Sequence, residues 1–230
     1  MNCRYRKEAL LVIIALLVST FAIAWTNADI KTSSLFFIDS RWPIGEQFPW
    51  KLLYRIDRFP AITMAAFGLV MFALSMYRPN KSAWQKPGLF LLLLLVIGPG
   101  LIVNATFKDH WGRPRPREII QFEGKKQFLH PWQKEISGNG RSFPSGHSSA
   151  AFYMIAPYFI YRKKERSKAY FWLAGGIVFG VLMSIARIAQ GGHFLSDCVW
   201  ALGFVYLTAL LLAALLKLES PKPAAASEHE

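Results

Sequence analysis

The chain has 230 residues, of which 53% are hydrophobic and only 18% are charged, and it carries a formal net charge of +13. Its charged residues leave six uncharged runs of 18 to 21 residues, at 9–28, 59–77, 87–107, 142–161, 169–186 and 198–216. Each run approaches the roughly 20 residues with which an α-helix crosses a hydrocarbon core about 30 Å thick. So many apolar runs leave too little polar surface for a soluble helical protein, which argues against that class. We therefore predict an all-α, polytopic membrane protein with six transmembrane helices in one domain over residues 1–218.

The first run has two interpretations. Three basic residues precede it and its apolar stretch ends in Ala22-Ile23-Ala24, so it resembles a signal peptide with a small-residue cleavage site. The run is long for the apolar part of a signal peptide, which favours a retained helix. In either case the loop that follows lies outside.

Basic residues mark the short loops. Five of them crowd 162–168, three lie in 78–86, and three precede the first run. Helix parity places these segments on one side, and short basic loops stay cytoplasmic. Both chain ends are therefore predicted to be inside, with the loops 27–58, 108–141 and 187–197 outside. Membrane topology thus accounts for much of the positive charge, and no nucleic-acid partner is predicted. The tail 219–230 is polar and rich in proline and alanine, so we expect it to be disordered.

The outer stretch 39–58 mixes aromatic side chains with arginine and lysine. This pattern fits an interfacial segment lying on the membrane surface, and it equally fits a structured loop outside the membrane. Either arrangement would help to shape the entrance for a headgroup.

The segment 108–117 follows the third run and holds four basic residues, Lys108, Arg113, Arg115 and Arg117. Two prolines stiffen it, and Pro116 pushes the backbone of Arg115 towards extended geometry. We interpret it as a rigid cationic edge at the membrane surface, although a solvated loop or a lipid-headgroup anchor has the same composition.

The stretch 143–149 reads FPSGHSS. Ser145 is a good N-cap, so a helix is predicted to begin here with free N–H groups that favour an anion such as phosphate. Gly146 allows a ligand to approach the backbone, and His147 lies in the first turn, where it can exchange protons with that anion. Taken alone, the stretch also fits a capped helix with an incidental histidine.

The third polar stretch joins the fifth and sixth runs, from Arg187 to Asp197. His193 precedes Asp197 by four residues, which places both on one face of a helix. The carboxylate can then accept the proton of one imidazole nitrogen and leave the other nitrogen as a nucleophile or base. If Asp197 instead caps the sixth helix, the two side chains still have a route to each other.

A divalent metal is the competing interpretation, with His147, His193, Asp197 and Asp109 as ligands. The neighbouring Lys108, Arg115 and Arg187 would repel a cation. Three cations with two histidines suit a bound oxyanion better, so no metal site and no cofactor are predicted.

The three motifs together resemble the type-2 phosphatidic acid phosphatase superfamily of lipid phosphatases and phosphotransferases. They are Lys108 with Arg115-Pro116 after six residues, Pro144-Ser145-Gly146-His147, and Arg187 with His193 and Asp197 at spacings of five and three. The motifs span 108–197, and the six-helix layout covers nearly the whole chain. One departure is Ala186, where the family often has a serine.

The resemblance implies a role for each residue. His193 would attack phosphorus and form a phosphohistidine, Asp197 would orient it, and His147 would protonate the departing oxygen. The phosphoryl oxygens would be held by Lys108, Arg115, Ser145, Gly146 and Arg187. Phosphoryl transfer is largely positioning and charge stabilisation, so these cations would do what magnesium does elsewhere, and the enzyme would be metal-independent.

The resemblance also implies a bacterial inner-membrane protein acting on a membrane lipid phosphate at the periplasmic face. Substrates common in the family are phosphatidylglycerophosphate, undecaprenyl pyrophosphate and the phosphates of lipid A, and the long basic loop 108–141 favours lipid A slightly. Two alternatives stay open: a phosphotransferase that uses the same phosphohistidine, and a transporter with an inactive site. Uncharged run interiors argue against the transporter.

Overall fold

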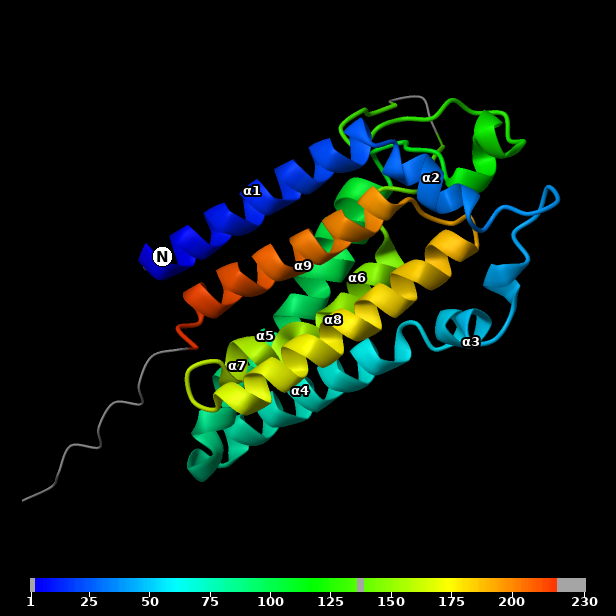
Figure 1. Ribbon diagram of the computed structural model, residues 1–230. Helices are drawn as coiled ribbons and strands as arrows, with labels where there is room; N and C mark the ends of the chain where they lie inside the picture. The colour runs from blue at the N-terminus through cyan, green and yellow to red at the C-terminus, as the bar shows by residue number, and fades with distance from the viewer. Residues whose placement is uncertain (1–2, 136–138, 219–230) are drawn as a thin grey trace, which may run out of the picture.

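The computed structural model describes residues 3–135 and 139–218, and within these ranges the chain is helical, with isolated bridges but no β-sheet. The tail 219–230, which we expected to be disordered, lies outside the described residues. The long helices run side by side as a bundle (Figure 1): α1 Cys3–Trp25, α4 Phe59–Tyr77, α5 Gln85–Leu95 continuing as the π-helix η3 Val96–Lys108, α8 Arg166–Ala189 and α9 Leu195–Leu215.

Short helices fill the connections: α2 Ala28–Ser34, η1 Ile44–Glu46, α3 Trp50–Arg55, η2 Pro79–Trp84, η4 Pro116–Glu118 and η5 Ile120–Phe122. Among the described residues, five helical segments are long and apolar enough to cross a membrane: Cys3–Trp25, Trp50–Tyr77, Ser82–Lys108, Arg166–Ala189 and Leu195–Leu215. They correspond to five of the six predicted helices.

The run 142–161 differs from the prediction because it is an interrupted helix. It forms α6 Gly146–Phe152, the 3₁₀ turn η6 Tyr153–Ile155 and α7 Ala156–Tyr161. Pro157 explains the break, because it has no N–H to donate to the carbonyl of Tyr153 and its ring crowds that carbonyl. None of the three pieces has the length of a membrane-crossing helix, so a sixth crossing remains a prediction.

The interrupted segment lies in the interior of the bundle and packs tightly against α8. Phe152, Tyr153 and Ile155 are buried. Gly176 and Gly180 of α8 face them: a Cβ at Gly180 would come 2.0 Å from Phe152 Cδ1, and one at Gly176 would come 2.6 Å from the Ile155 nitrogen. Small residues four apart let two helix backbones approach closely. This packing fixes the position of α6, whose first turn carries His147.

The first helix is part of the bundle. Leu16 of α1 packs over Gly203 of α9, where an added Cβ would come 2.5 Å from Leu16 Cδ1. The indole N–H of Trp200 donates to the Thr20 hydroxyl at 3.0 Å. These contacts pack α1 against α9, and whether the helix is retained or cleaved stays a prediction.

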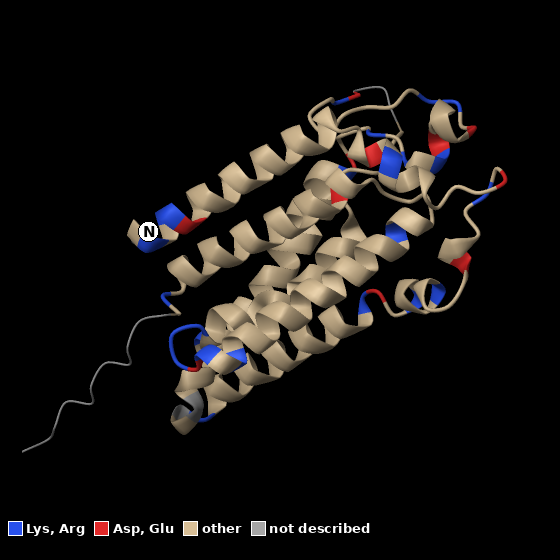
Figure 2. Cartoon of the chain, viewed as in Figure 1, with Lys and Arg blue, Asp and Glu red and all other residues tan. Residues whose placement is uncertain are grey.

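Charge is distributed differently at the two ends of the bundle (Figure 2). One end holds the N-terminal residues, the α4–α5 connection, the α7–α8 loop and the C-terminal end of α9, and its charged residues are mostly lysine and arginine. The other end holds α2, α3 and the loop that follows η3, where acidic and basic residues are mixed. The three basic segments assigned to one side by helix parity therefore lie at one end.

Candidate active site

His193 lies in the tight turn between α8 and α9. Gly191 makes the turn with a φ of +59°, and a Cβ there would come 2.4 Å from Trp42 Cε2. The imidazole is fully buried, and its Nδ1 lies 2.7 Å from the carbonyl oxygen of Ser142. A carbonyl only accepts, so Nδ1 carries the proton, and Nε2, which has no hydrogen-bond partner among the described residues, has its lone pair available.

Burial lowers the pKa of His193 to about 4, against the opposing effect of the Asp197 carboxylate. The imidazole is therefore neutral at physiological pH. A neutral imidazole with one nitrogen fixed as a donor and the other open is the form that a nucleophile requires.

Asp197, in the first turn of α9, holds the surroundings of His193 in place. Its Oδ2 lies 3.7 Å from His193 Nδ1, beyond hydrogen-bond distance, and accepts instead from the Ser142 hydroxyl at 2.6 Å and the Phe194 N–H at 2.8 Å. The expected direct hydrogen bond from His193 to the Asp197 carboxylate is therefore not formed, and His193 Nδ1 donates to the Ser142 carbonyl instead. Asp197 remains near enough to stabilise positive charge on the ring.

Arg113, in the loop after η3, forms ion pairs with both Asp197 of α9 and Asp29 of α2. The sequence did not reveal this role. Its NH1 donates to Asp197 Oδ1 at 2.5 Å and its NH2 to Asp29 Oδ2 at 2.8 Å, and the side chain is completely buried. Ser196 completes the network, because its N–H and hydroxyl both donate to Asp29, at 2.8 and 2.6 Å. One cation between two carboxylates, with further hydrogen bonds, satisfies buried charges that would otherwise be costly.

His147 lies on the opposite, more open side of the site. Its Nε2 is 3.2 Å from Asp57 Oδ2, and its ring stacks on Tyr54 with centroids 5.1 Å apart. Both partners come from α3 and the turn after it, within the stretch 39–58. This segment therefore forms part of the site wall. Tyr54 is one of the aromatic residues for which the sequence marked the stretch 39–58, whereas Asp57 was not singled out.

The three predicted phosphate-binding cations converge from different elements. Lys108 ends η3 and its Nζ would lie 3.0 Å from a Cβ at Gly146, while the Arg187 guanidinium lies 4.8 Å from the Tyr54 ring centroid. Lys108 is within electrostatic range of both Arg115 and Arg187. Burial, followed by repulsion from Arg117, lowers the pKa of Arg115. Three cations brought this close outnumber the carboxylates beside them, Glu118 next to Arg115 and Asp57 next to His147, and so favour a bound anion.

Ser145 is the N-cap of α6, as predicted, and its hydroxyl accepts from the Ser148 N–H at 3.3 Å. The same hydroxyl lies 2.8 Å from the Ser148 hydroxyl and is completely buried, so the side chain points into the protein. A side chain at position 146 would not fit, because a Cβ there would come 2.5 Å from Asn104 Oδ1.

A cavity of about 400 Å³ opens between α4, η3 and α6 beside Lys108, Gly146 and His147, whereas His193, Arg115 and Arg187 are not among its lining residues. Its polar side includes Lys108, His147, Asn104 and Arg58, and its apolar side includes Ile62 and Leu95. A phosphate attached to an acyl chain matches both sides. The described residues contain no group of three His, Cys, Asp or Glu side chains suited to a metal, and Asp109 forms an ion pair with Arg141 instead.

Comparison with known proteins agrees with the motifs. The PAP2 superfamily model matches residues 87–219. The chain is 32% identical over 213 residues to a lipid A 4'-phosphatase of Francisella tularensis subsp. novicida, covering 89% of this chain and 95% of that protein. It is 32% identical over 212 residues to a lipid A 4'-phosphatase of Rhizobium etli, covering 82% of this chain and 79% of that protein. A phosphatidylglycerophosphatase B of Bacillus subtilis is 31% identical over 113 residues, 46% of this chain and 48% of that protein. No solved structure matches the chain.

Proposed function

The chain belongs to the PAP2 superfamily and is a membrane lipid phosphatase, and from that premise we propose that it removes a phosphate from its lipid through a phosphohistidine on His193. One observation carries the proposal: a buried, neutral imidazole whose Nε2 is open while its Nδ1 proton is held by the Ser142 carbonyl. A buried structural histidine would be expected to have partners on both nitrogens.

In the proposed first step, His193 Nε2 forms a bond to phosphorus as the bond to the lipid oxygen breaks. His147 gives its proton to that oxygen, and Lys108, Arg115 and Arg187 stabilise the charge on the phosphoryl oxygens. The imidazole becomes positive, and Asp197, 3.7 Å from Nδ1, stabilises it. In the second step His147 takes a proton from water, the hydroxide attacks phosphorus, and His193 leaves as the neutral ring.

We propose lipid A as the preferred substrate, with phosphatidylglycerophosphate and undecaprenyl pyrophosphate as the other candidates. The names of the two relatives with the broadest coverage support this order. The decisive experiment is phosphate release by the purified protein against these three lipids at equal surface concentration. Adding a second lipid acceptor to the vesicles separates hydrolysis from phosphotransfer, because transfer yields a phosphorylated acceptor in place of inorganic phosphate.

The proposed chemistry needs no divalent metal, since the cations of the chain itself surround the phosphate. Activity in detergent is therefore expected to survive an excess of chelator. Loss of turnover that a single metal restores would overturn this part of the proposal.

We further propose that the site faces the periplasm of a bacterial inner membrane. In a Cys3→Ser background, a cysteine introduced at the exposed Gln127 should react with an impermeant thiol reagent added to intact spheroplasts, and one at the exposed Ser167 should not. The opposite labelling pattern would move the site to the cytoplasm.

A further inference from the structure

The cavity beside His147 contains an arginine that belongs to none of the three phosphatase motifs. Arg58 lies in the connection between α3 and α4 and lines this cavity together with Lys108 and His147. It is close enough to both side chains to repel a positive charge on either of them. The chemistry proposed for His193 uses Lys108 and the two motif arginines, so it leaves Arg58 without a role.

Arg58 lies between the polar and the apolar parts of the cavity. Its carbonyl oxygen accepts the Ile62 N–H at 2.9 Å, so Ile62 lies one helical turn further along α4. Ile62 lines the apolar part with Leu95, whereas Lys108 and His147 line the polar part. A lipid whose terminal phosphate lies in the polar part and whose acyl chain passes Ile62 therefore places the rest of its headgroup beside Arg58.

The guanidinium of Arg58 is available to a ligand. The side chain is 72% exposed, its Nε lies 3.4 Å from Asp57 Oδ2, and the guanidinium donates no hydrogen bond to any residue that the structure describes. The same Oδ2 lies 3.2 Å from His147 Nε2, so Arg58 shares this carboxylate with the histidine. A largely exposed ion pair of this kind contributes little stability, so an anion can replace Asp57 as the partner of Arg58 at small cost.

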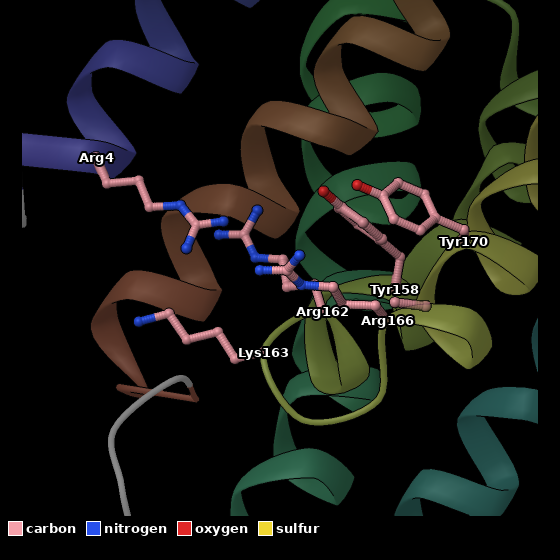
Figure 3. Close-up of a pocket in the computed structure, with 7 residues that line it drawn as sticks. Arg4, Tyr158, Arg162, Lys163, Arg166 and Tyr170 are labelled. Carbon is pink, nitrogen blue, oxygen red and sulfur yellow. The ribbon is translucent and has the colours of Figure 1, made fainter.

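Arg162, at the end of the bundle remote from His193, has the opposite surroundings. It lines a second basic cavity, which Figure 3 shows. The side chain is 6% exposed, and its NH1 donates to both carboxylate oxygens of Glu8, at 2.8 and 3.1 Å. Arg162 therefore has a fixed carboxylate partner inside the protein, whereas Arg58 makes a long ion pair with a carboxylate that it shares.

We propose that Arg58 is a substrate-binding residue that recognises a second phosphate in the headgroup of the lipid. The inference rests on the proposed phosphatase function, because Arg58 is placed relative to a phosphate held beside Lys108 and His147. The terminal nitrogens of the guanidinium make charge-assisted hydrogen bonds to the oxygens of this second phosphate. Phosphatidylglycerophosphate carries such a group, a phosphodiester, whereas phosphatidic acid carries only the phosphate that is removed.

The test compares these two lipids, which release the same kind of leaving group, a primary alkoxide, and differ in the second phosphate. Arg58→Gln removes the charge and Arg58→Lys keeps it. Arg55→Gln is the matched control, because it removes an exposed charge at the end of α3 that does not line the cavity. The values of kcat and KM are measured for each purified protein in mixed micelles, with the same acyl chains on both lipids.

We expect Arg58→Gln to raise the KM for phosphatidylglycerophosphate by about tenfold, the loss expected for one charge-assisted hydrogen bond, and to leave kcat within about twofold. The KM for phosphatidic acid should rise by at most about threefold, because only a longer-range attraction is lost. Arg58→Lys should recover part of the KM for phosphatidylglycerophosphate. Arg55→Gln should change either constant by less than about twofold, as expected for a surface substitution.

Three results would overturn the role of Arg58. An equal rise in KM for both lipids, or the same rise in Arg55→Gln, would mean a general attraction of anions. A fall in kcat on both lipids with KM unchanged would mean that Arg58 acts through Asp57 on His147. A wild-type protein that releases phosphate from lipid A but from neither of these lipids would also refute the role, while the proposed phosphatase function would stand.

Discussion

The two histidines of the site stand in contrasting surroundings. His193 is completely buried, and its Nδ1 is fixed by a backbone carbonyl. Behind it, buried ion pairs of Arg113 connect α9 with α2. His147 lines an open cavity, and its partners Tyr54 and Asp57 are side chains of a short helix and its following turn. The inner side is built on backbone and buried ion pairs, whereas the outer side is built on surface side chains.

The contrast matches what each proposed role demands. A nucleophile must attack phosphorus along one line, so its ring has to be held rigidly. A general acid must reach the oxygen that bears the lipid, so it has to face the opening through which the lipid arrives. We therefore expect changes on the inner side to be severe for every substrate, and changes on the outer side to depend on the leaving group.

The largest effect should separate the two histidines directly. His193→Ala should abolish turnover of both a lipid phosphate and a nitrophenyl phosphate, because no phosphoenzyme can form. His147→Ala should lose about 10²–10⁴-fold on the lipid phosphate and recover much of that rate on the nitrophenyl ester, whose leaving group departs without a proton. Steady-state rates on both substrates measure this, and rapid acid quench detects the phosphoenzyme in His147→Ala.

The opposite pattern would reverse the assignment. If the better leaving group rescued His193→Ala, then His193 would be the general acid. Equal losses by both variants on both substrates would show that the contrast between the two sides has no chemical meaning.

The next effect concerns the network behind His193. Arg113→Ala leaves Asp29 and Asp197 buried without their cation, which should lower the free energy of unfolding by about 3–5 kcal/mol. Arg117→Ala, at an exposed neighbouring arginine, should change it by less than about 0.5 kcal/mol. Chemical denaturation in detergent gives both values.

Arg113→Lys provides a test of function in a protein more apt to fold. A lysine keeps the charge but cannot bond to both carboxylates in the fixed geometry of a guanidinium. Because Arg113 acts through Asp197, kcat should fall for both substrates while KM changes little. A rise in KM with unchanged kcat would instead give Arg113 a direct part in substrate binding.

The sequence predicted the parts of the molecule that depend on local chemistry. The run 59–77 coincides with α4, and α8 and α9 begin and end within three residues of their runs, because charges mark where a helix leaves the apolar region. The N-cap at Ser145 followed from the residue type alone. The break in 142–161 was missed, although Pro157 was a visible signal for it.

The contacts that the sequence could not reveal join residues far apart in the chain. Arg113 meets Asp29 and Asp197 across 84 positions in either direction, and His147 meets Asp57 only because α3 folds over the site. Such pairs depend on how helices pack, which composition and spacing do not encode. Arg113 was recognised as basic, and its partners were the missing information.

A smaller effect is expected from the partner of His147. Burial, followed by repulsion from Arg187, lowers the pKa of His147, and the neighbouring Asp57 carboxylate acts in the opposite direction because it favours the protonated imidazole that a general acid requires. Asp57→Asn should therefore reduce the rate on the lipid phosphate by about tenfold, a fraction of the full general-acid contribution. The rate on the nitrophenyl ester should change by less than twofold. Asp39→Asn, the same substitution in an exposed turn of the same loop, serves as the control and should leave both rates unchanged. An equal loss on both substrates would make Asp57 a structural residue.

The smallest effect should come from Tyr54, which stacks on His147 and lies under the Arg187 guanidinium. Tyr54→Phe keeps the ring face and should alter kcat and KM by less than twofold. Tyr54→Leu removes the cation–π contact, worth about 0.5–1 kcal/mol at a partly exposed position, and should therefore raise KM by about two- to fivefold. On the inner side we expect substitutions to cost more, because its groups are held by buried charges and backbone. If Tyr54→Leu instead lowered kcat as strongly as Arg113→Lys does, the outer side would be as rigidly required as the inner one, and the division between the two would fail.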